Sequence, residues 1–400
     1  MSVEEISSTN NRSTAAASSS ISLTPPSLIS HKVIIDECDR GLYLIGGWKD
    51  ESFNQENFVR DVWKLNFSSN LWTKLRSRDA PPSLANHTVA RLDARRILVY
   101  GGSLLGRGDS LGNNNETYLY DTKNQLWSKL ATTGDICPKP SRHWFGQAMC
   151  KVGSKLYVAT GRRDRAFGDG QLLIHSLDLN SLRWSYLSTP DFEPEGRVRH
   201  ELVVYDGKLY IFGGAQCSFE KTFTMKTIPC FDPISATWID RATKPDPKAG
   251  HPESRTCHTI VRYGENLYVC GGYFIPDSRS DQKAKSFDDF WKFHLPTFQW
   301  TKMASTLPFN LWAHAADITS DGRLYILGGC RTTTTGKKRR SETVLTLNIG
   351  IPRLENLAWR SAFGNFAPRS LLDGDLTKKS AILNNQEYGL TNYFIEKLNW

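Results

Sequence analysis

The sequence predicts an all-β fold, a six-bladed β-propeller, from one pattern that recurs along the chain. Six times a short apolar run ends in a pair of small residues, and in five copies a Trp follows. The pairs are Gly46-Gly47, Gly101-Gly102, Thr160-Gly161, Gly213-Gly214, Gly271-Gly272 and Gly328-Gly329, and the tryptophans are Trp72, Trp127, Trp184, Trp238 and Trp300. A spacing of roughly 55 residues indicates one supersecondary unit that is copied along the chain.

The second copy shows the strands of the unit. Alternating apolar and polar residues predict strands at His87–Leu92, Arg96–Tyr100, Thr117–Tyr120 and Leu126–Leu130, since a period of two is typical of half-buried strands. Turn residues at 121–124 separate the last two. Each copy is therefore expected to form a four-stranded blade, and 30–350 to form the propeller.

The repeated residues have structural tasks. Paired glycines allow backbones to approach closely and to take a positive φ where strands crowd the centre. Tryptophans on fourth strands and aromatic residues on third strands supply area that packs one blade on the next. The third-strand aromatics are Trp63, Tyr118, Phe231 and Trp291. We expect all of these residues in the core rather than in a site.

The sixth copy stops early. Its second and third strands are predicted at Leu324–Gly329 and Glu342–Asn348, but Ile351-Pro352 then begins a different pattern. A propeller hides its sheet edges by closing the ring. The missing strand should come from upstream of His31, with Ile21–Ile29 as the candidate. The rest of 1–29 is polar and is expected to be a disordered tail.

Charge and composition argue for a binding protein without a nucleic-acid or membrane partner. The net charge is +9, but the basic residues are scattered apart from Lys337–Arg340. That run is more often a solvated loop tip than a nuclear signal or a phosphate contact. No stretch is apolar for 18 residues, so no membrane span is expected.

Cysteine usage and motifs exclude several kinds of chemistry. The eight cysteines form no C-x-x-C pair, which favours reduced thiols in the cytoplasm or nucleus over disulfides or a zinc site. No P-loop, G-x-S-x-G or H-E-x-x-H motif occurs. We therefore expect no enzyme, no metal and no cofactor, with specificity in the loops at one mouth of the propeller.

A recurring pattern before the first strands suggests where a ligand binds. Arginines or a Trp precede a His in several of these loops, which converge on one face. The candidates are Arg142 and Trp144 on either side of His143, Arg199 with His200, Arg255, and Trp312. Arg162, which follows the irregular Thr160-Gly161 pair, is a further candidate. Guanidinium groups bind carboxylates through paired charge-assisted hydrogen bonds. The alternative is that these side chains cap loops and connect blades. The repeat places the histidines at equivalent positions, which favours this structural role for them, but the role of the arginines stays open.

With these residues in view, the chain resembles the kelch-repeat family over the whole repeat region. Stretches such as Lys139–Arg142, Gly146–Met149 and Arg199–Glu201 are similar to family members that act as substrate receptors of cullin-2 RING ubiquitin ligases. The resemblance implies a non-catalytic receptor for C-terminal degrons that end in Gly. It also implies a pocket for a free carboxylate, in which Trp144, Tyr273 or Trp312 grips the preceding residues.

The segment after the propeller changes period from two to 3.6. Leu354, Leu357, Ala358 and Ala362 fall on one helical stripe, and Pro352 suits a helix start. The stripe resembles a BC box, which binds elongin C, although Ala358 replaces the usual Cys and Arg353 departs from the pattern.

A second motif follows in the same segment. Pro368 and Leu371 within Ala367–Leu371 resemble a cullin-2 box, so elongin B/C and cullin-2 are the implied partners of 351–376. A tail, 377–400, follows. The alternatives are two short helices packed under the propeller, and a kelch scaffold that regulates a signalling kinase or phosphatase without ligase assembly.

Overall fold

The structure, a computed structural model, describes residues 3–6, 24–49, 57–76, 78–82, 84–105, 111–113, 116–134, 146–161, 170–187, 194–277, 280–333 and 337–350. Met1–Ser320 and Leu324–Leu347 form one compact unit, and Asp321–Arg323 with Asn348–Trp400 form a second. Within the second unit, the Ile349 N–H donates to the Gly322 carbonyl at 2.8 Å. The predicted helical segment, 351–376, and the tail, 377–400, lie outside the described residues.

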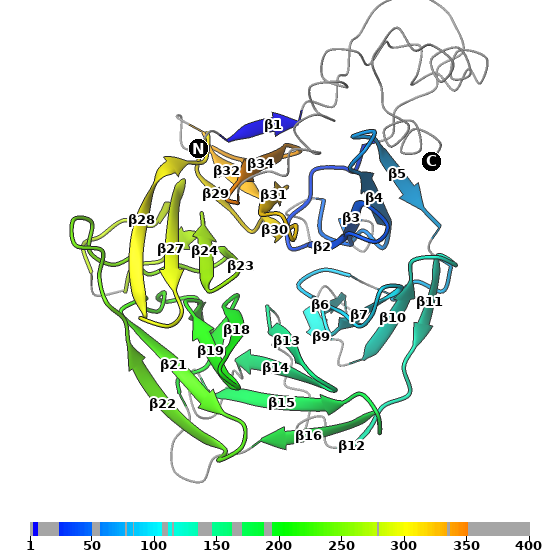
Figure 1. Ribbon diagram of the computed structural model, residues 1–400, viewed down its shortest axis with the longest axis horizontal. Coiled ribbons are helices and arrows are strands. Elements are labelled where there is room, and N and C mark those ends of the chain that lie inside the picture. The colour runs from blue at the N-terminus through cyan, green and yellow to red at the C-terminus, as the bar shows by residue number, and fades with distance from the viewer. Residues whose placement is uncertain are drawn as a thin grey trace, which may run out of the picture. The chain divides into compact units, whose positions relative to one another are not determined.

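The first unit is a ring of six antiparallel sheets, or blades (Figure 1). The main strands of each blade are given from the innermost to the outermost. Blade 1 contains β2 (Lys32–Asp36), β3 (Gly41–Ile45), β4 (Val62–Asn66) and β5 (Trp72–Leu75). Blade 2 contains β6 (Thr88–Arg91), β7 (Arg96–Tyr100), β10 (Thr117–Asp121) and β11 (Leu126–Lys129), and blade 3 contains β13 (Ala148–Val152), β14 (Lys155–Gly161), β15 (Leu172–Asp178) and β16 (Arg183–Leu187). Blades 4 and 5 are β18 (Glu201–Tyr205), β19 (Lys208–Phe212), β21 (Thr227–Asp232), β22 (Thr237–Ala242); and β23 (Thr259–Tyr263), β24 (Asn266–Cys270), β27 (Asp289–His294), β28 (Gln299–Thr306). The predicted all-β, six-bladed architecture is confirmed, and the four strands expected in the second copy are present.

Blade 6 closes the ring with a strand from the start of the sequence. It contains β30 (Ala315–Ile318), β31 (Arg323–Leu327), β34 (Val344–Asn348) and, as its outermost strand, β1 (Glu4–Ile6). Ile6 lies opposite Val344 in an antiparallel register. The closing strand comes from upstream of His31 as expected, but the choice of Ile21–Ile29 is wrong.

Residues 24–29 instead pack against the inner end of blade 1. Leu28 is buried in the core, and Ile29 exchanges backbone hydrogen bonds with Trp48. Pro25-Pro26 restricts this segment as a ladder strand because proline has no N–H to donate. Residues 4–6, which the sequence suggested lie in a disordered tail, thus form a strand of the propeller, and residues 28–29 pack beside blade 1 instead of closing blade 6.

Smaller sheets decorate one face of the ring. In each blade the second strand ends at its pair of small residues, beside the start of the first strand. The loops that leave these pairs and the loops that enter the first strands therefore lie on the same face, which we call the glycine-pair face. The decorating strands are β8 (Ser103–Leu105) with β9 (Leu111–Asn113), β17 (Arg197–Val198) with β20 (Ala215–Gln216), β25 (Tyr273–Phe274) with β26 (Lys285–Ser286), and β29 (Leu311–Trp312) with β32 (Cys330–Thr332) and β33 (Lys338–Arg340).

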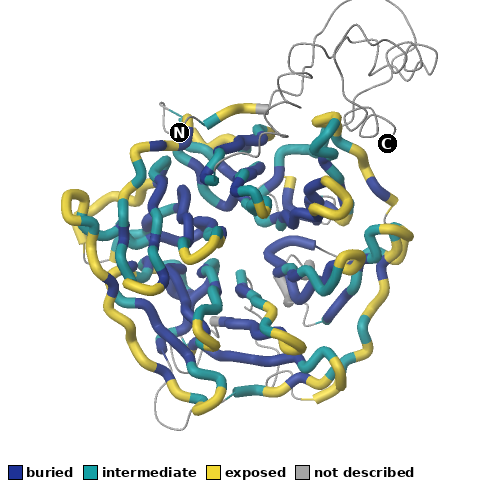
Figure 2. The backbone as a smooth tube through the Cα atoms, in the orientation of Figure 1, coloured by how far each residue is buried: buried dark blue, intermediate teal, exposed yellow. Residues whose placement is uncertain are grey.

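Apolar residues from neighbouring blades fill the spaces between the sheets. Trp184 of blade 3 packs against Tyr100 of blade 2, with ring centroids 4.7 Å apart, and both are buried. Trp300 of blade 5 meets Phe212 of blade 4 edge-on. Burial follows the same logic in Figure 2, where the second and third strands of the blades are mostly buried and the outer turns are exposed. The repeated aromatic residues are core, as predicted, except that Trp72 is only partly buried where it packs against the core between blades 6 and 1.

Linkers between blades cover outer sheet edges. The strand β12 (Thr133–Gly134), which leaves blade 2, runs parallel to β16 of blade 3. Lys244 and Gln299 make the equivalent bridge between blades 4 and 5. An uncovered edge is a template for pairing with another chain, so each of these linkers protects the next blade.

We expect removal of residues 1–6 to lower the free energy of unfolding by about 1–3 kcal/mol, because it deletes several backbone hydrogen bonds worth ~1 kcal/mol each. It also exposes the β34 edge and should increase self-association. Urea unfolding and light scattering measure the two effects. Glu5→Gln, which keeps the backbone pairing, should match the parent protein. An unchanged unfolding midpoint in the deletion would contradict the assignment of β1.

Candidate functional site

Six equivalent residues surround the propeller axis, one at the entrance to each first strand. They are His31, His87, Gln147, His200, His258 and His314. The residue before each has a positive φ, between 54° and 68°, and these residues are Ser30, Asn86, Gly146, Arg199, Cys257 and Ala313. We call this second set the axial ring. Positive φ is unusual for residues other than Gly and Asn, so the surrounding fold imposes this conformation.

Backbone hydrogen bonds connect the axial ring from blade to blade. The N–H of Asn86 donates to the Ser30 carbonyl at 3.0 Å, and Arg199 donates to Gly146 at 2.7 Å. Ala313 donates to Cys257 at 2.9 Å. Weaker links join Cys257 to Arg199 and Ser30 to Ala313. The left-handed turn thus points each of these N–H groups at the preceding blade.

The histidines fill the space beside the glycine pairs. A Cβ on Gly213, which has φ +60°, would lie 2.7 Å from the His258 ring of the next blade. A Cβ on Gly214 would lie 2.9 Å from His200 Cβ of its own blade. A side chain at either glycine would therefore collide with a ring that has no room to move.

Burial keeps these imidazoles neutral. It lowers the pKa of His31 to about 4, and that of His87, His200 and His314 to about 3. The pKa of His258 is also lowered well below its usual value by burial. Neutral rings packed on glycines favour a structural role for the histidines, including His200.

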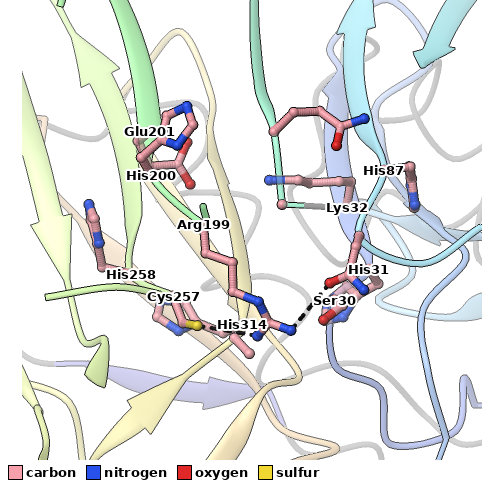
Figure 3. Close-up of a pocket in the computed structure, with 14 residues that line it drawn as sticks. Ser30, His31, Lys32, His87, Arg199, His200, Glu201, Cys257, His258 and His314 are labelled. Atoms are coloured by element: carbon pink, nitrogen blue, oxygen red, sulfur yellow. Dashed lines mark hydrogen bonds between the residues drawn. The ribbon is translucent and has the colours of Figure 1, made fainter. Parts of the chain in front are cut away.

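Arg199 is the axial-ring residue whose side chain crosses the centre. Its Nη1 donates to Cys257 Sγ at 3.3 Å and its Nη2 to Asn86 Oδ1 at 3.4 Å, which links blades 4, 5 and 2. Figure 3 shows the guanidinium reaching toward Ser30. Arg199 makes no ion pair with any residue that the structure describes. Both acceptors are neutral and the bonds are long, so the guanidinium retains capacity for an anion.

A central cavity of about 60 Å³ lies around this side chain. It is lined by residues of the axial ring, by the six residues that follow them, and by Lys32 and Glu201. Burial raises the pKa of Glu201, which reduces its negative charge, while Lys32 opposes that shift. A space of this size holds a few water molecules or one small polar group. The positive charges of Arg199 and Lys32 make an anionic group the best match for this cavity.

Arg255 has a different environment from Arg199. Its guanidinium is fully buried and donates to both carboxylate oxygens of Asp289, at 2.6 and 3.0 Å, and to the Gly271 carbonyl at 2.9 Å. Burial alone would raise the Asp289 pKa, but hydrogen bonds from Arg255 hold it below its usual range. This pairing stabilises blade 5 and leaves Arg199 as the stronger of the two anchor candidates.

Two aromatic candidates lie together at the rim of the cavity. The rings of Tyr273 and Trp312 are 5.5 Å apart at 47°. Trp312 directly precedes Ala313 of the axial ring, and Tyr273 exchanges backbone hydrogen bonds with Thr256, which precedes Cys257. Arg199 and His200 line the cavity, whereas Tyr273 and Trp312 are not among its lining residues and adjoin the axial ring through Thr256 and Ala313. Arg142, Trp144 and Arg162 lie outside the described residues.

Sequence reasoning missed Ser30, Asn86, Cys257 and Lys32, all of which line the cavity. These residues differ in type from copy to copy, so no arginine or aromatic pattern marks the position directly before His. That position has an available signal, since Asn86 and Gly146 are the residues that tolerate positive φ best.

A search of family models matches 6–214 and 146–359 to the kelch-repeats domain of KLHDC2, KLHL20 and DRC7. The chain belongs to the kelch-repeat family. It is 30% identical over 389 residues to Kelch domain-containing protein 10 of Rattus norvegicus, covering 94% of this chain and 86% of the relative. The human protein of that name gives the same identity, with 80% of it covered. Kelch-repeat proteins are typically non-catalytic scaffolds or adaptors.

More distant relatives share the same architecture. A Drosophila melanogaster homolog of Kelch domain-containing protein 10 is 25% identical, over 82% of this chain and 56% of the relative. The solved structure titled "Structure of YjhT" superimposes with a TM-score of 0.58 at 18% identity, covering 80% of this chain and 95% of that one. That likeness concerns the fold alone.

Searches for other kinds of site give negative results over the part of the chain that the structure describes. There, no three His, Cys, Asp or Glu residues are grouped so that they could hold a metal ion. Among the same residues, no helix is long and apolar enough to cross a membrane.

We expect acid to destabilise this kelch protein through its buried histidines. Unfolded histidine titrates near pH 6.5, whereas His87 in the folded state titrates at about 3. Between these values the unfolded chain binds protons that the folded chain does not, so stability falls as pH falls, by up to about 1.4 kcal/mol per unit for each His. Asp317, whose pKa burial raises to about 6, opposes the trend.

Urea unfolding at pH 7 and pH 5 measures this effect. The His87→Gln variant is the matched control because Gln147 occupies the equivalent place in blade 3. It should lose about 1.4 kcal/mol less per pH unit than the parent protein over this range. Identical pH dependence in the two proteins would contradict the role of the buried ring.

Proposed function

We propose that this kelch protein is the substrate-recognition subunit of a cullin-2 RING ubiquitin ligase and binds substrate C-termini that end in Gly. Arg199 carries the proposal, because its guanidinium lies in the central cavity and makes no ion pair with the residues that the structure describes. A terminal carboxylate can accept two charge-assisted hydrogen bonds from one guanidinium. The ubiquitin transfer itself would be performed by other subunits.

The size and lining of the cavity support a terminal group. A volume of about 60 Å³ suits a carboxylate and the atoms next to it, but not a large side chain. Ser30 and Asn86 add a hydroxyl and an amide beside Arg199. A final Gly would also let the substrate backbone approach the axial ring closely.

Docking to the ligase depends on the segment after the propeller. The proposal assigns elongin C to Leu354, Leu357, Ala358 and Ala362, and cullin-2 to Pro368 and Leu371. An exposed apolar helix face of this kind fits a partner groove. Its support is the resemblance to the BC and cullin-2 boxes, and we place the receptor in the cytoplasm or nucleus, where such ligases would meet it.

Peptide binding tests the recognition half. Fluorescence polarisation with Gly-ended peptides should show binding that is lost when the C-terminus is amidated. Arg199→Ala should weaken binding tenfold or more, the loss of about one charge-assisted bond. Arg95→Ala, which removes an exposed guanidinium paired with Asp121, should bind as the parent does. Equal affinity for free and amidated peptides would contradict the proposal.

Affinity purification tests the ligase half. The full chain should recover elongin B/C and cullin-2 from cells, and Leu354→Asp should abolish recovery because it places a charge on the apolar face. The same variant should still bind peptide, since the propeller is untouched. Recovery without elongins, or recovery that Leu354→Asp does not change, would instead favour a kelch scaffold outside a ligase.

A further inference from the structure

The β32–β33 hairpin gives the glycine-pair face an unpaired cluster of positive charge beside the cavity. Lys338 and Arg339 are exposed on β33, and neither makes an ion pair with any residue that the structure describes. Opposite Arg339, Arg331 on β32 packs its guanidinium over Phe309, 5.1 Å from the ring centre, while its Nε is buried with no partner among the described atoms. We call Arg331, Lys338 and Arg339 the basic hairpin.

Aromatic rings hold one of these cations at the rim of the cavity. The Lys338 ammonium lies 5.5 Å from the Trp312 ring and 5.7 Å from the Tyr273 ring. The ring faces attract the cation electrostatically and fix its position, but they supply no negative charge. Trp312 pairs with Cys330 of β32, so the sheet that carries the basic hairpin starts one residue from Ala313 of the axial ring.

The neighbouring charges show that this cluster is not simply part of a neutralised surface. Lys285 on β26, in the next loop, has its carboxylate partner, Glu253, at 2.7 Å. Lys221 on the blade 4 loop has Glu195 at 3.3 Å. Lys285 and Lys221 are therefore paired with carboxylates, whereas Lys338 and Arg339 have no carboxylate partner among the residues that the structure describes.

We infer that the basic hairpin binds acidic side chains of the substrate a few residues upstream of its C-terminus. The inference rests on the proposed function. A peptide whose carboxylate meets Arg199 leaves the cavity past Tyr273 and Trp312, and an extended chain advances about 3.3 Å per residue. Asp or Glu side chains at that distance reach Lys338 and Arg339, where each exposed pair adds modestly to affinity and more to specificity.

A peptide fits this surface better than nucleic acid does. Phosphate backbones are bound by extended rows of cations that neutralise many charges. Here the cations of the basic hairpin form no extended row, and the carboxylates of Glu253 and Glu195 lie on other loops of the face. A short acidic segment that is already anchored at its end needs only two or three positive partners.

The test is a set of labelled peptides with the same Gly-ended C-terminus and a pair of Asp, Ser or Lys residues moved stepwise upstream. On the full chain, at its best position, the Asp pair should bind about fivefold more tightly than the Lys pair. The preference should shrink at high salt, because exposed charges are screened. The double variant Lys338→Glu, Arg339→Glu should reverse the order.

Controls separate this inference from the proposed function. Lys123→Glu, on the turn between β10 and β11, makes the matched charge reversal away from the face and should keep the Asp preference. Equal binding of Asp and Lys peptides, with amidation still abolishing binding, would overturn the inference and leave the proposed function standing. Failure of every Gly-ended peptide to bind would overturn both. Retention of RNA or anionic vesicles by the basic hairpin, in place of acidic peptides, would overturn the inference alone.

Discussion

The packing of a histidine ring against a glycine pair is the contact on which the centre of this propeller depends. It brings neighbouring blades so close that a Cβ on Gly213 or Gly271 would collide with the next imidazole. It also turns the preceding residue into the left-handed conformation, whose N–H groups then bind the neighbouring blade. The glycine-pair face, the cavity and the orientation of Arg199 all follow from this contact.

The two arginines of blades 4 and 5 show how the same scaffold separates stability from recognition. Arg255 lies three residues before its His and is paired with Asp289, so removing it would leave a largely buried carboxylate with only the Trp291 N–H as a side-chain donor. Arg199 lies one residue before its His, projects into the cavity, and contacts two neutral hydrogen-bond acceptors and the ring of Phe219. A shift of two positions along the chain therefore separates a structural cation from an available one.

The repeat made most of the fold predictable, because glycine pairs and alternating strands are local signals. The position of the closing strand was not predictable in this way, because β1 has only three residues, Glu4–Ile6, and its partner β34 is remote in sequence. In the site, the aromatic pair and Arg199 were found from their residue types. The pairing of Arg255 with Asp289 was not predicted, because the sequence does not show that this arginine faces a carboxylate 34 residues away.

The place of β1 has a consequence for synthesis of the chain. Glu4–Ile6 leaves the ribosome before any blade exists, but its partner Val344–Thr346 is made only after five blades are complete. Contacts of such long sequence separation form late and slowly. Blades 1 to 5 can therefore assemble in order, while the sixth waits with an open edge. A ring closed in this way is finished in one late step that joins the two ends of the repeat region.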